Sequence, residues 1–168
     1  MIYIWGESGA GKTHLLRAFT ASGRARYVPA ADYGPSIEGA LAIDDVEGLS
    51  EAQQVELFNA FNERSHGFLL VAASAAPRDV NLRRDLATRL ATGLTYRILP
   101  LSDDEKRAAL GAHAKVRGFD LSDDVAGYLL THARRDMGSL ISALDTLDRY
   151  SLETGRAVTV PLLKAALQ

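Results

Sequence analysis

Short runs of apolar residues alternate with segments of helical periodicity over the first hundred residues. The apolar runs predict five strands, at Ile2–Trp5, Tyr27–Pro29, Leu41–Ile43, Phe68–Ala73 and Leu94–Leu99. Apolar residues three or four apart predict helices between them, most clearly over Glu51–Arg64 and around Leu82, Leu86 and Leu90. Strands that alternate with helices form a parallel sheet covered by helices. We therefore predict an α/β domain with a five-stranded parallel sheet over residues 1–100.

The pattern changes after Pro100, where only helical periodicity remains. Ser102 and Glu105 form a capping box that opens a helix, and Gly118 is placed to end it. Further helices are expected to begin after Ser122, after Asp136 and around Pro161, the last running to Leu167. Residues 101–168 are therefore predicted to form a small domain of four helices.

Composition and charge narrow the class of protein. Apolar residues make up 47% of the chain, which is enough for a packed core, and the net charge is only −2. Without a basic region, autonomous DNA binding is not expected. The absence of cysteine excludes disulfides, thiolate catalysis and cysteine-ligated zinc. No apolar run approaches the ~18 residues that span a bilayer, and no signal peptide precedes the first strand, so we expect a cytoplasmic protein without membrane contact.

One motif carries specific chemistry. Residues 6–13 match the phosphate-loop pattern G-x-x-x-x-G-K-[S/T] at every fixed position, directly after a predicted strand and at the start of a helix. Glycines let successive backbone N–H groups point at an anion, and a following helix N-terminus favours negative charge. A chance glycine-rich turn is the alternative, but it rarely occurs in this context. The predicted nucleotide-binding residues are Gly6, Gly9, Ala10, Gly11, Lys12, Thr13 and His14.

Polar residues follow two other predicted strands. Behind a phosphate loop, Asp44 is expected to hold Mg²⁺ together with Thr13, and Asp45 to orient or deprotonate an attacking water. A strand that simply ends in an aspartate-rich turn is the alternative. Ser74 follows the strand Phe68–Ala73 and is placed to position water beside the γ-phosphate if that strand lies next to the first. Its alternative is a capping serine ahead of Pro77.

Among several arginines, Arg89 has the most specific position. It precedes Leu90 in the helix marked by Leu82, Leu86 and Leu90, so we expect it at the edge of the buried face, near the carboxyl rim of the sheet. A solvated arginine is the ordinary interpretation. The functional one is an arginine finger that reaches the nucleotide of a neighbouring subunit.

Several segments resemble known proteins. Gly11–Leu16 together with Ile43–Asp45 resemble the AAA+ ATPases of the DnaA group of replication initiators. Pro100–Lys106, Gly118–Ser122 and Asp145–Leu152 are similar to the Hda family, the DnaA-like regulatory inactivators that switch off the initiator after replication begins. The resemblance covers nearly the whole chain. The phosphate loop is specific only to the superfamily, whereas the segments after residue 100 point to Hda.

This resemblance implies an AAA+ nucleotide domain followed by a four-helix lid. It places the phosphate loop (Walker A) on Gly11, Lys12 and Thr13, Walker B on Asp44 and Asp45, the first sensor on Ser74 and the arginine finger on Arg89. It further implies that the protein carries ADP or ATP with Mg²⁺ and stimulates ATP hydrolysis on DnaA in trans. Its own ATPase activity would be weak, and the DNA polymerase sliding clamp would be a second partner.

The chain departs from the family pattern in three places. Gly138 stands where the family has its second-sensor arginine, for which Arg134 or Arg135 is a candidate replacement. Only Ala30–Gly39 joins the second and third strands, which leaves no room for the helical insertion with which initiators handle DNA. The chain starts at the first strand, so the family's N-terminal segment, which carries the clamp-binding peptide in Hda, is expected to be missing, and clamp binding is assigned to no residue present.

Two other functions remain as alternatives to a regulator. A DnaA-type initiator or helicase-loader ATPase needs a DNA-binding module or a basic surface. A small-molecule phosphotransferase starts with the same loop but needs an acceptor pocket under a mobile lid. The helical second half favours an AAA+ protein over the phosphotransferase, and the Hda resemblance favours the regulator over the initiator.

Overall fold

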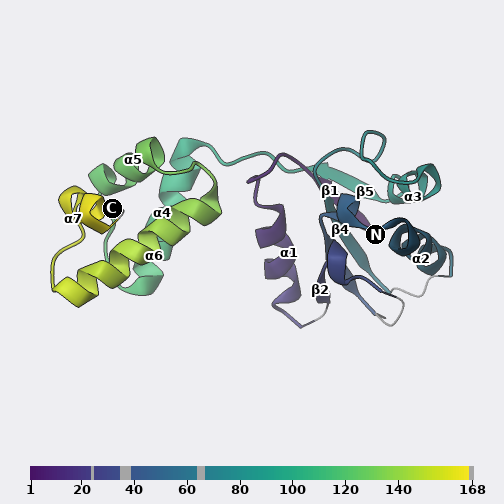
Figure 1. Cartoon of the computed structure of the whole chain (residues 1–168), viewed down its shortest axis with the longest axis horizontal. Helices are drawn as coiled ribbons and strands as arrows, with labels where there is room; N and C mark the ends of the chain where they lie inside the picture. Colours follow the sequence, from purple (N-terminus) through teal and green to yellow (C-terminus); the bar gives the residue numbers. More distant parts are fainter. Residues whose placement is uncertain (24, 35–38, 64–66, 167–168) are drawn as a thin grey trace. The chain divides into compact units, whose positions relative to one another are not determined.

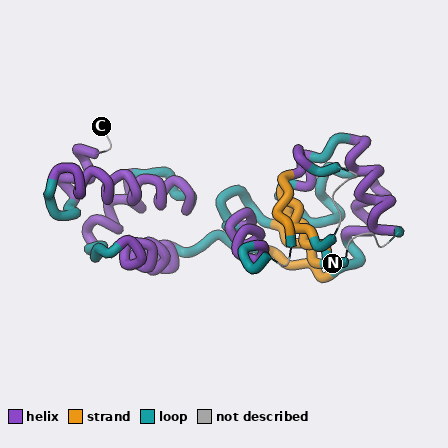
Figure 2. The backbone as a smooth tube through the Cα atoms, turned by 90° about the horizontal axis from the view of Figure 1, so that it is seen from below, coloured by secondary structure: helices purple, strands orange, loops and turns teal. Residues whose placement is uncertain are grey.

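The computed structural model describes residues 1–23, 25–34, 39–63 and 67–166. The chain divides into two compact units, Met1–Pro100 and Leu101–Gln168. Strands occur in the first unit, and the described part of the second is entirely helices and loops (Figure 2). No helix in these described ranges is long and apolar enough to cross a membrane.

The first unit contains the predicted five-stranded parallel sheet, in the order β2-β3-β4-β1-β5. Its strands are β1 (Ile2–Trp5), β2 (Arg26–Pro29), β3 (Leu41–Asp44), β4 (Leu69–Ala73) and β5 (Leu94–Arg97). Strand β5 stops at Arg97 instead of Leu99. Among the described residues it is an edge strand paired with β1, and all four of its residues are exposed, so the apolar run alone overestimated its length.

Helices cover both faces of this sheet. On one face lies α1 (Lys12–Thr20), whose Leu16 packs against Ile4, Ala42, Leu70 and Ala72. On the other lie α2 (Glu51–Asn62) and α3 (Arg84–Leu90), which bury Leu57, Leu86 and Leu90 against Tyr3, Ile43 and Val71 (Figure 1). The short 3₁₀ turns η1 (Ala30–Asp32) and η2 (Val46–Gly48) follow β2 and β3. Helix α2 ends at Asn62, and Arg64 lies outside the described residues.

The second unit consists of α4 (Asp103–Arg117), α5 (Asp123–His132), α6 (Met137–Thr154) and α7 (Val160–Ala166). The predicted starts of the first three are confirmed, because Ser102, Ser122 and Asp136 each accept a hydrogen bond from a first-turn backbone N–H. Leucines form the core, among them Leu110, Leu129, Leu140, Leu144, Leu147 and Leu163. The end predicted for the last helix, Leu167, lies outside the described residues.

Candidate functional site

The predicted phosphate loop connects the end of β1 to the start of α1, at the carboxyl edge of the sheet. Gly9 and Gly11 have φ angles of 81° and 94°, a region that glycine adopts without steric cost. A Cβ on Gly6 would lie 2.2 Å from the carbonyl oxygen of Ile98, so no side chain fits there. The backbone itself therefore requires the glycine at these three positions.

Lys12 is the first residue of α1 and is only 8% exposed. Its Nζ donates hydrogen bonds to the carbonyl oxygens of Gly6 at 2.8 Å and Glu7 at 3.1 Å, so the ammonium lies against the loop. Thr13 and His14 follow in the same helical turn with exposed side chains. Gly11 caps the helix without a side-chain hydrogen bond, which leaves the first backbone N–H groups available to an anion.

Asp44 ends β3 and is 3% exposed. One carboxylate oxygen, Oδ2, accepts a hydrogen bond from the Tyr27 hydroxyl at 2.9 Å. The other, Oδ1, is buried and has no hydrogen-bond partner in the described residues. A buried oxygen without a partner is costly in free energy, and Mg²⁺ prefers oxygen ligands such as carboxylate and hydroxyl groups. Asp44, together with Thr13, therefore supplies a donor set that fits Mg²⁺.

Asp45 follows immediately and is the one non-glycine residue with positive φ, 52°, in the parts of the chain that the structure describes. Partial burial raises the pKa of its carboxyl group, and the charges of Asp44 and Glu47 raise it further, while Lys12 lowers it. Asp45 directly follows the end of β3, at the same edge of the sheet as the phosphate loop. A carboxyl group whose pKa lies above its ordinary value is better suited to accept a proton from water.

Ser74 follows β4, which lies between β1 and β3 in the sheet, so this exposed residue emerges between the phosphate loop and Asp44. Its backbone N–H donates to Oε1 of Glu47 at 2.8 Å. Glu47, which lies in η2, was not predicted from the sequence. The available signal was a third carboxylate two residues beyond Asp45. Burial, and secondarily the Glu47 charge, raises the pKa of Tyr3, whose hydroxyl donates to the carbonyl of Ala75 at 2.8 Å.

The structure thus gathers the loop, Asp44, Asp45 and Ser74 at the carboxyl edge of one sheet. Arg89 is not with them. It lies in the last turn of α3, on the opposite face of the sheet from α1 (Figure 1). The expectation that it lies near the carboxyl rim is wrong. Helix α3 returns the chain from the end of β4 to the start of β5, where Leu94 N–H donates to the carbonyl of Met1 at 3.3 Å.

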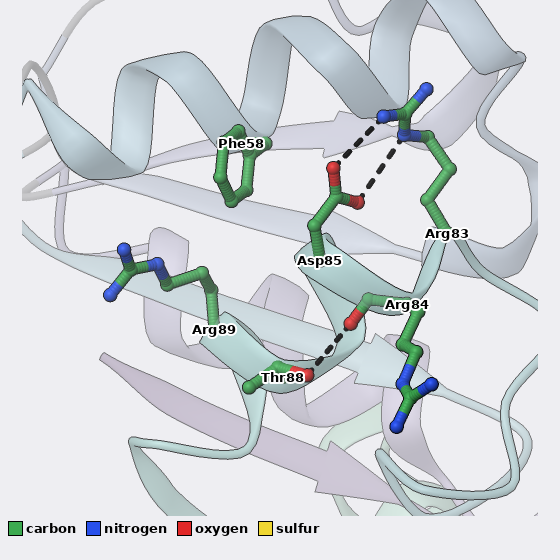
Figure 3. A pocket seen from close by; sticks show the side chains of 6 residues that line it. All are labelled: Phe58, Arg83, Arg84, Asp85, Thr88 and Arg89. Atoms are coloured by element: carbon green, nitrogen blue, oxygen red, sulfur yellow. Dashed lines mark hydrogen bonds and ion pairs between the residues drawn. The ribbon is translucent and has the colours of Figure 1, made fainter.

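Arg89 lines a pocket of about 690 Å³ with Phe58, Arg83, Arg84, Asp85 and Thr88 (Figure 3). Its guanidinium carbon lies 5.9 Å from the centre of the Phe58 ring, which comes from α2. Arg83 is neutralised by Asp85 at 2.9 Å. Within the described ranges, neither Arg84 nor Arg89 has an ion pair, and Figure 3 shows their side chains pointing in different directions. Arg89 is therefore an exposed cation held against an aromatic ring.

In the second unit, Gly138 is the second residue of α6. Arg135 donates to Asp103 at 2.6 Å, and Arg134 lies 3.6 Å from Asp136. Both arginines thus pair with carboxylates of their own unit, and whether either replaces a second-sensor arginine stays a prediction.

Comparison with known proteins supports this architecture. The family model described as "Hda, lid domain" matches residues 103–167. Domain III of the Thermotoga maritima replication initiation protein DnaA superposes with a TM-score of 0.79 at 20% identity, over 99% of this chain and 82% of that one. AMPPCP-bound DnaA from Aquifex aeolicus gives 0.72 at 23% identity, covering 90% of this chain and 56% of its own length. The Thermotoga maritima RuvB Holliday junction branch migration motor gives 0.75 at 16% identity, covering 99% and 60%.

The first unit matches the sheet and flanking helices expected of an AAA+ domain, and the second matches a sequence family over almost its whole length. The chain therefore has the fold of DnaA domain III, and its residues 103–167 match the lid-domain model of the Hda family.

Proposed function

We propose that this protein is a nucleotide-bound regulator of replication initiation, which stimulates hydrolysis of ATP on the initiator DnaA through Arg89 in trans and so inhibits re-initiation. The observation that carries this proposal is the position of Arg89. It is exposed, it has no carboxylate partner in the described residues, and its helix covers the face of the sheet opposite α1. An arginine placed in this way suits a nucleotide held by another molecule.

The chain's own phosphate loop supports one part of this proposal, namely that the regulator carries a bound nucleotide. Lys12 and the N–H groups of the loop are placed to bind phosphate oxygens, and Thr13 and Asp44 to hold Mg²⁺, which when bound neutralises phosphate charge. The AMPPCP bound to a DnaA of the same fold supports an adenine nucleotide. The ligand in this proposal is ADP or ATP; the Hda resemblance implies action with ADP bound, while Asp45 and Ser74 serve a weak hydrolysis of ATP.

Arg89 would act on the partner's ATP through its guanidinium group. A guanidinium donates several N–H groups in one plane, a geometry that suits phosphate oxygens on which charge develops during transfer. The Phe58 ring lies within cation–π distance of the guanidinium group, an attraction that favours this position of the side chain. Arginine fingers contribute about 10³- to 10⁵-fold to the rate in well-studied systems. One residue supplied in trans is therefore sufficient for a large effect.

The partners follow from the same resemblance. DnaA is the proposed target, and the sliding clamp is the proposed site of recruitment. The net charge of −2 gives no support for DNA binding by the chain itself.

The test is ATP hydrolysis by DnaA after addition of this protein with ADP and DNA-loaded sliding clamp. Arg89→Ala should bind ADP as the wild type does and should lose the stimulation. Arg78→Ala removes an exposed arginine paired with Asp79 and serves as the matched control that keeps it. Lys12→Ala should weaken nucleotide binding, so the stimulation measured with it serves as the reference for a regulator that has lost its nucleotide. Stimulation by Arg89→Ala at the wild-type level would refute the proposal. Strong ATP turnover by the chain alone would favour the initiator or helicase-loader ATPase.

A further inference from the structure

The Tyr27 hydroxyl reaches Asp44 across two neighbouring strands. In the parallel pairing of β2 with β3, Tyr27 lies beside Ala42, and Asp44 is two residues further along β3, on the same face of the sheet. The hydroxyl spans this diagonal and donates to Oδ2 at 2.9 Å. The contact joins an edge strand to the carboxylate at the centre of the candidate Mg²⁺ site.

This contact gives the two carboxylate oxygens of Asp44 different surroundings. Oδ2 is occupied by the hydroxyl, while Oδ1 is buried and has no hydrogen-bond partner in the described part of the chain. A hydrogen bond to one oxygen restricts rotation of the carboxylate about its Cβ–Cγ bond, which favours one direction for the other oxygen. The free, buried oxygen is the one available to a cation.

Tyr27 is itself held in place from the helical side. Its ring packs partly buried against the cluster of Ile4, Leu16, Ala42, Leu70 and Ala72. The guanidinium carbon of Arg17 on α1 lies 5.1 Å from the ring centre. Because Arg17 is one helical turn after Thr13, the same helix that carries the proposed hydroxyl ligand also restrains the tyrosine. The ring is therefore a rigid link between α1 and Asp44.

We propose that Tyr27 is a positioning residue for the Mg²⁺–nucleotide site, which holds Asp44 by Oδ2 so that Oδ1 faces the metal. The inference rests on the proposed function in one respect, namely that the phosphate loop binds a nucleotide with Mg²⁺. It adds a residue outside the Walker motifs to that site. Tyr27 acts only through Asp44 and does not contact the nucleotide or the metal.

The expected effect is on metal affinity and not on nucleotide affinity. Removal of a hydrogen bond to a metal-ligating side chain typically lowers metal affinity about 10- to 100-fold. Tyr27→Phe removes the hydroxyl and keeps the ring, so packing under α1 is preserved. We therefore expect this variant to bind Mg²⁺ at least tenfold more weakly in the presence of ADP. Its affinity for ADP without Mg²⁺ should equal that of the wild type.

The experiment measures binding of a fluorescent ADP analogue to the whole chain, first in EDTA and then during a titration with Mg²⁺. Binding of Mn²⁺ followed by electron paramagnetic resonance gives a direct metal readout. Tyr96→Phe is the matched control, because Tyr96 is an exposed tyrosine on β5 of the same sheet. This control should titrate as the wild type does.

A double-mutant cycle tests the route through Asp44. If Tyr27 acts through that carboxylate, Tyr27→Phe should cause no further loss of Mg²⁺ affinity in an Asp44→Asn background. Unchanged Mg²⁺ affinity in Tyr27→Phe, or a full additional loss in the double variant, would overturn the inference and leave the proposed function intact. A wild-type chain that binds no nucleotide would overturn both.

Discussion

Replacement of Gly6 by alanine tests whether the phosphate loop is packed as tightly as the structure indicates. The new Cβ would lie 2.2 Å from the Ile98 carbonyl oxygen and 3.2 Å from its carbon, whereas real Cβ contacts are essentially never shorter than 3.0 Å. The obstacle is backbone, which cannot rotate away as a side chain would. Ile98 must therefore retreat by about 0.8 Å. Its N–H donates to the carbonyl of Trp5 at 2.7 Å, so this shift strains the hydrogen bond that joins the chain after β5 to β1.

The loss of stability in Gly6→Ala follows from the clash with the Ile98 carbonyl and from the strained hydrogen bond. Overpacking of a filled site costs about 1–3 kcal/mol, and a lost backbone hydrogen bond adds about 1 kcal/mol. The lower entropy of the unfolded alanine chain returns less than about 1 kcal/mol. We therefore expect the free energy of unfolding of the first unit to fall by about 1–4 kcal/mol, with a central value of about 2–3 kcal/mol, a substantial part of the ~5–15 kcal/mol of a typical domain.

Urea unfolding followed by tryptophan fluorescence measures this quantity. Trp5 is the only tryptophan in the chain and precedes Gly6, so its signal reports on the first unit without the lid helices. Gly34→Ala is the control, since an added Cβ there would have no atom within 4 Å and the φ of Gly34 is outside the left-handed region. That variant should stay within about 1 kcal/mol of the wild type. An equally small change in Gly6→Ala would refute the packing argument.

Two further predictions concern the lid. Leu144→Ala removes a fully buried core side chain and should lower the free energy of unfolding of the second unit by about 2–5 kcal/mol. Leu152 is largely exposed, so Leu152→Ala should change this free energy by less than ~0.5 kcal/mol. Urea unfolding followed by far-ultraviolet circular dichroism measures both variants, and equal effects would contradict the assigned core. Hydrogen bonding with Ser139 lowers the pKa of Asp136 from its ordinary 3.8, so this cap stabilises the fold above that value and loses its effect as the pH falls through the lowered pKa. Asp136→Asn carries no titrating group at this position, so its melting temperature should fall less than that of the wild type between about pH 5 and pH 2. An equal fall in both proteins would contradict this role of Asp136.

Local patterns were sufficient to predict most of the fold. The five strands follow from apolar runs, and the starts of three lid helices follow from Ser102, Ser122 and Asp136, because capping depends on residues within one turn. The end of β5 was misjudged because Ile98 and Leu99 continue the apolar run, although the strand is paired on one side only.

Some residues of the candidate site are also predictable from local sequence, and others are not. The phosphate loop and the two aspartates are each contiguous in sequence, so their spacing predicts them. The contact of Tyr27 with Asp44 depends on strand register, and the contact of Glu47 with Ser74 spans 27 residues, so neither has a local signature. Arg89 was expected at the wrong edge of the sheet because a helical stripe defines a face but not the direction in which the helix crosses the sheet.

The trans-acting role of Arg89 is tested by asking which molecule's ATP is hydrolysed. DnaA is loaded with radiolabelled ATP, freed of excess nucleotide and mixed with this protein carrying unlabelled ADP, in the presence of DNA-loaded sliding clamp. Release of labelled phosphate is then followed over a single turnover. If Arg89 acts in trans, release with the wild type should be roughly a thousandfold or more faster than with Arg89→Ala, while Arg78→Ala should match the wild type. Equal release with the wild type and Arg89→Ala would contradict the trans-acting role of Arg89.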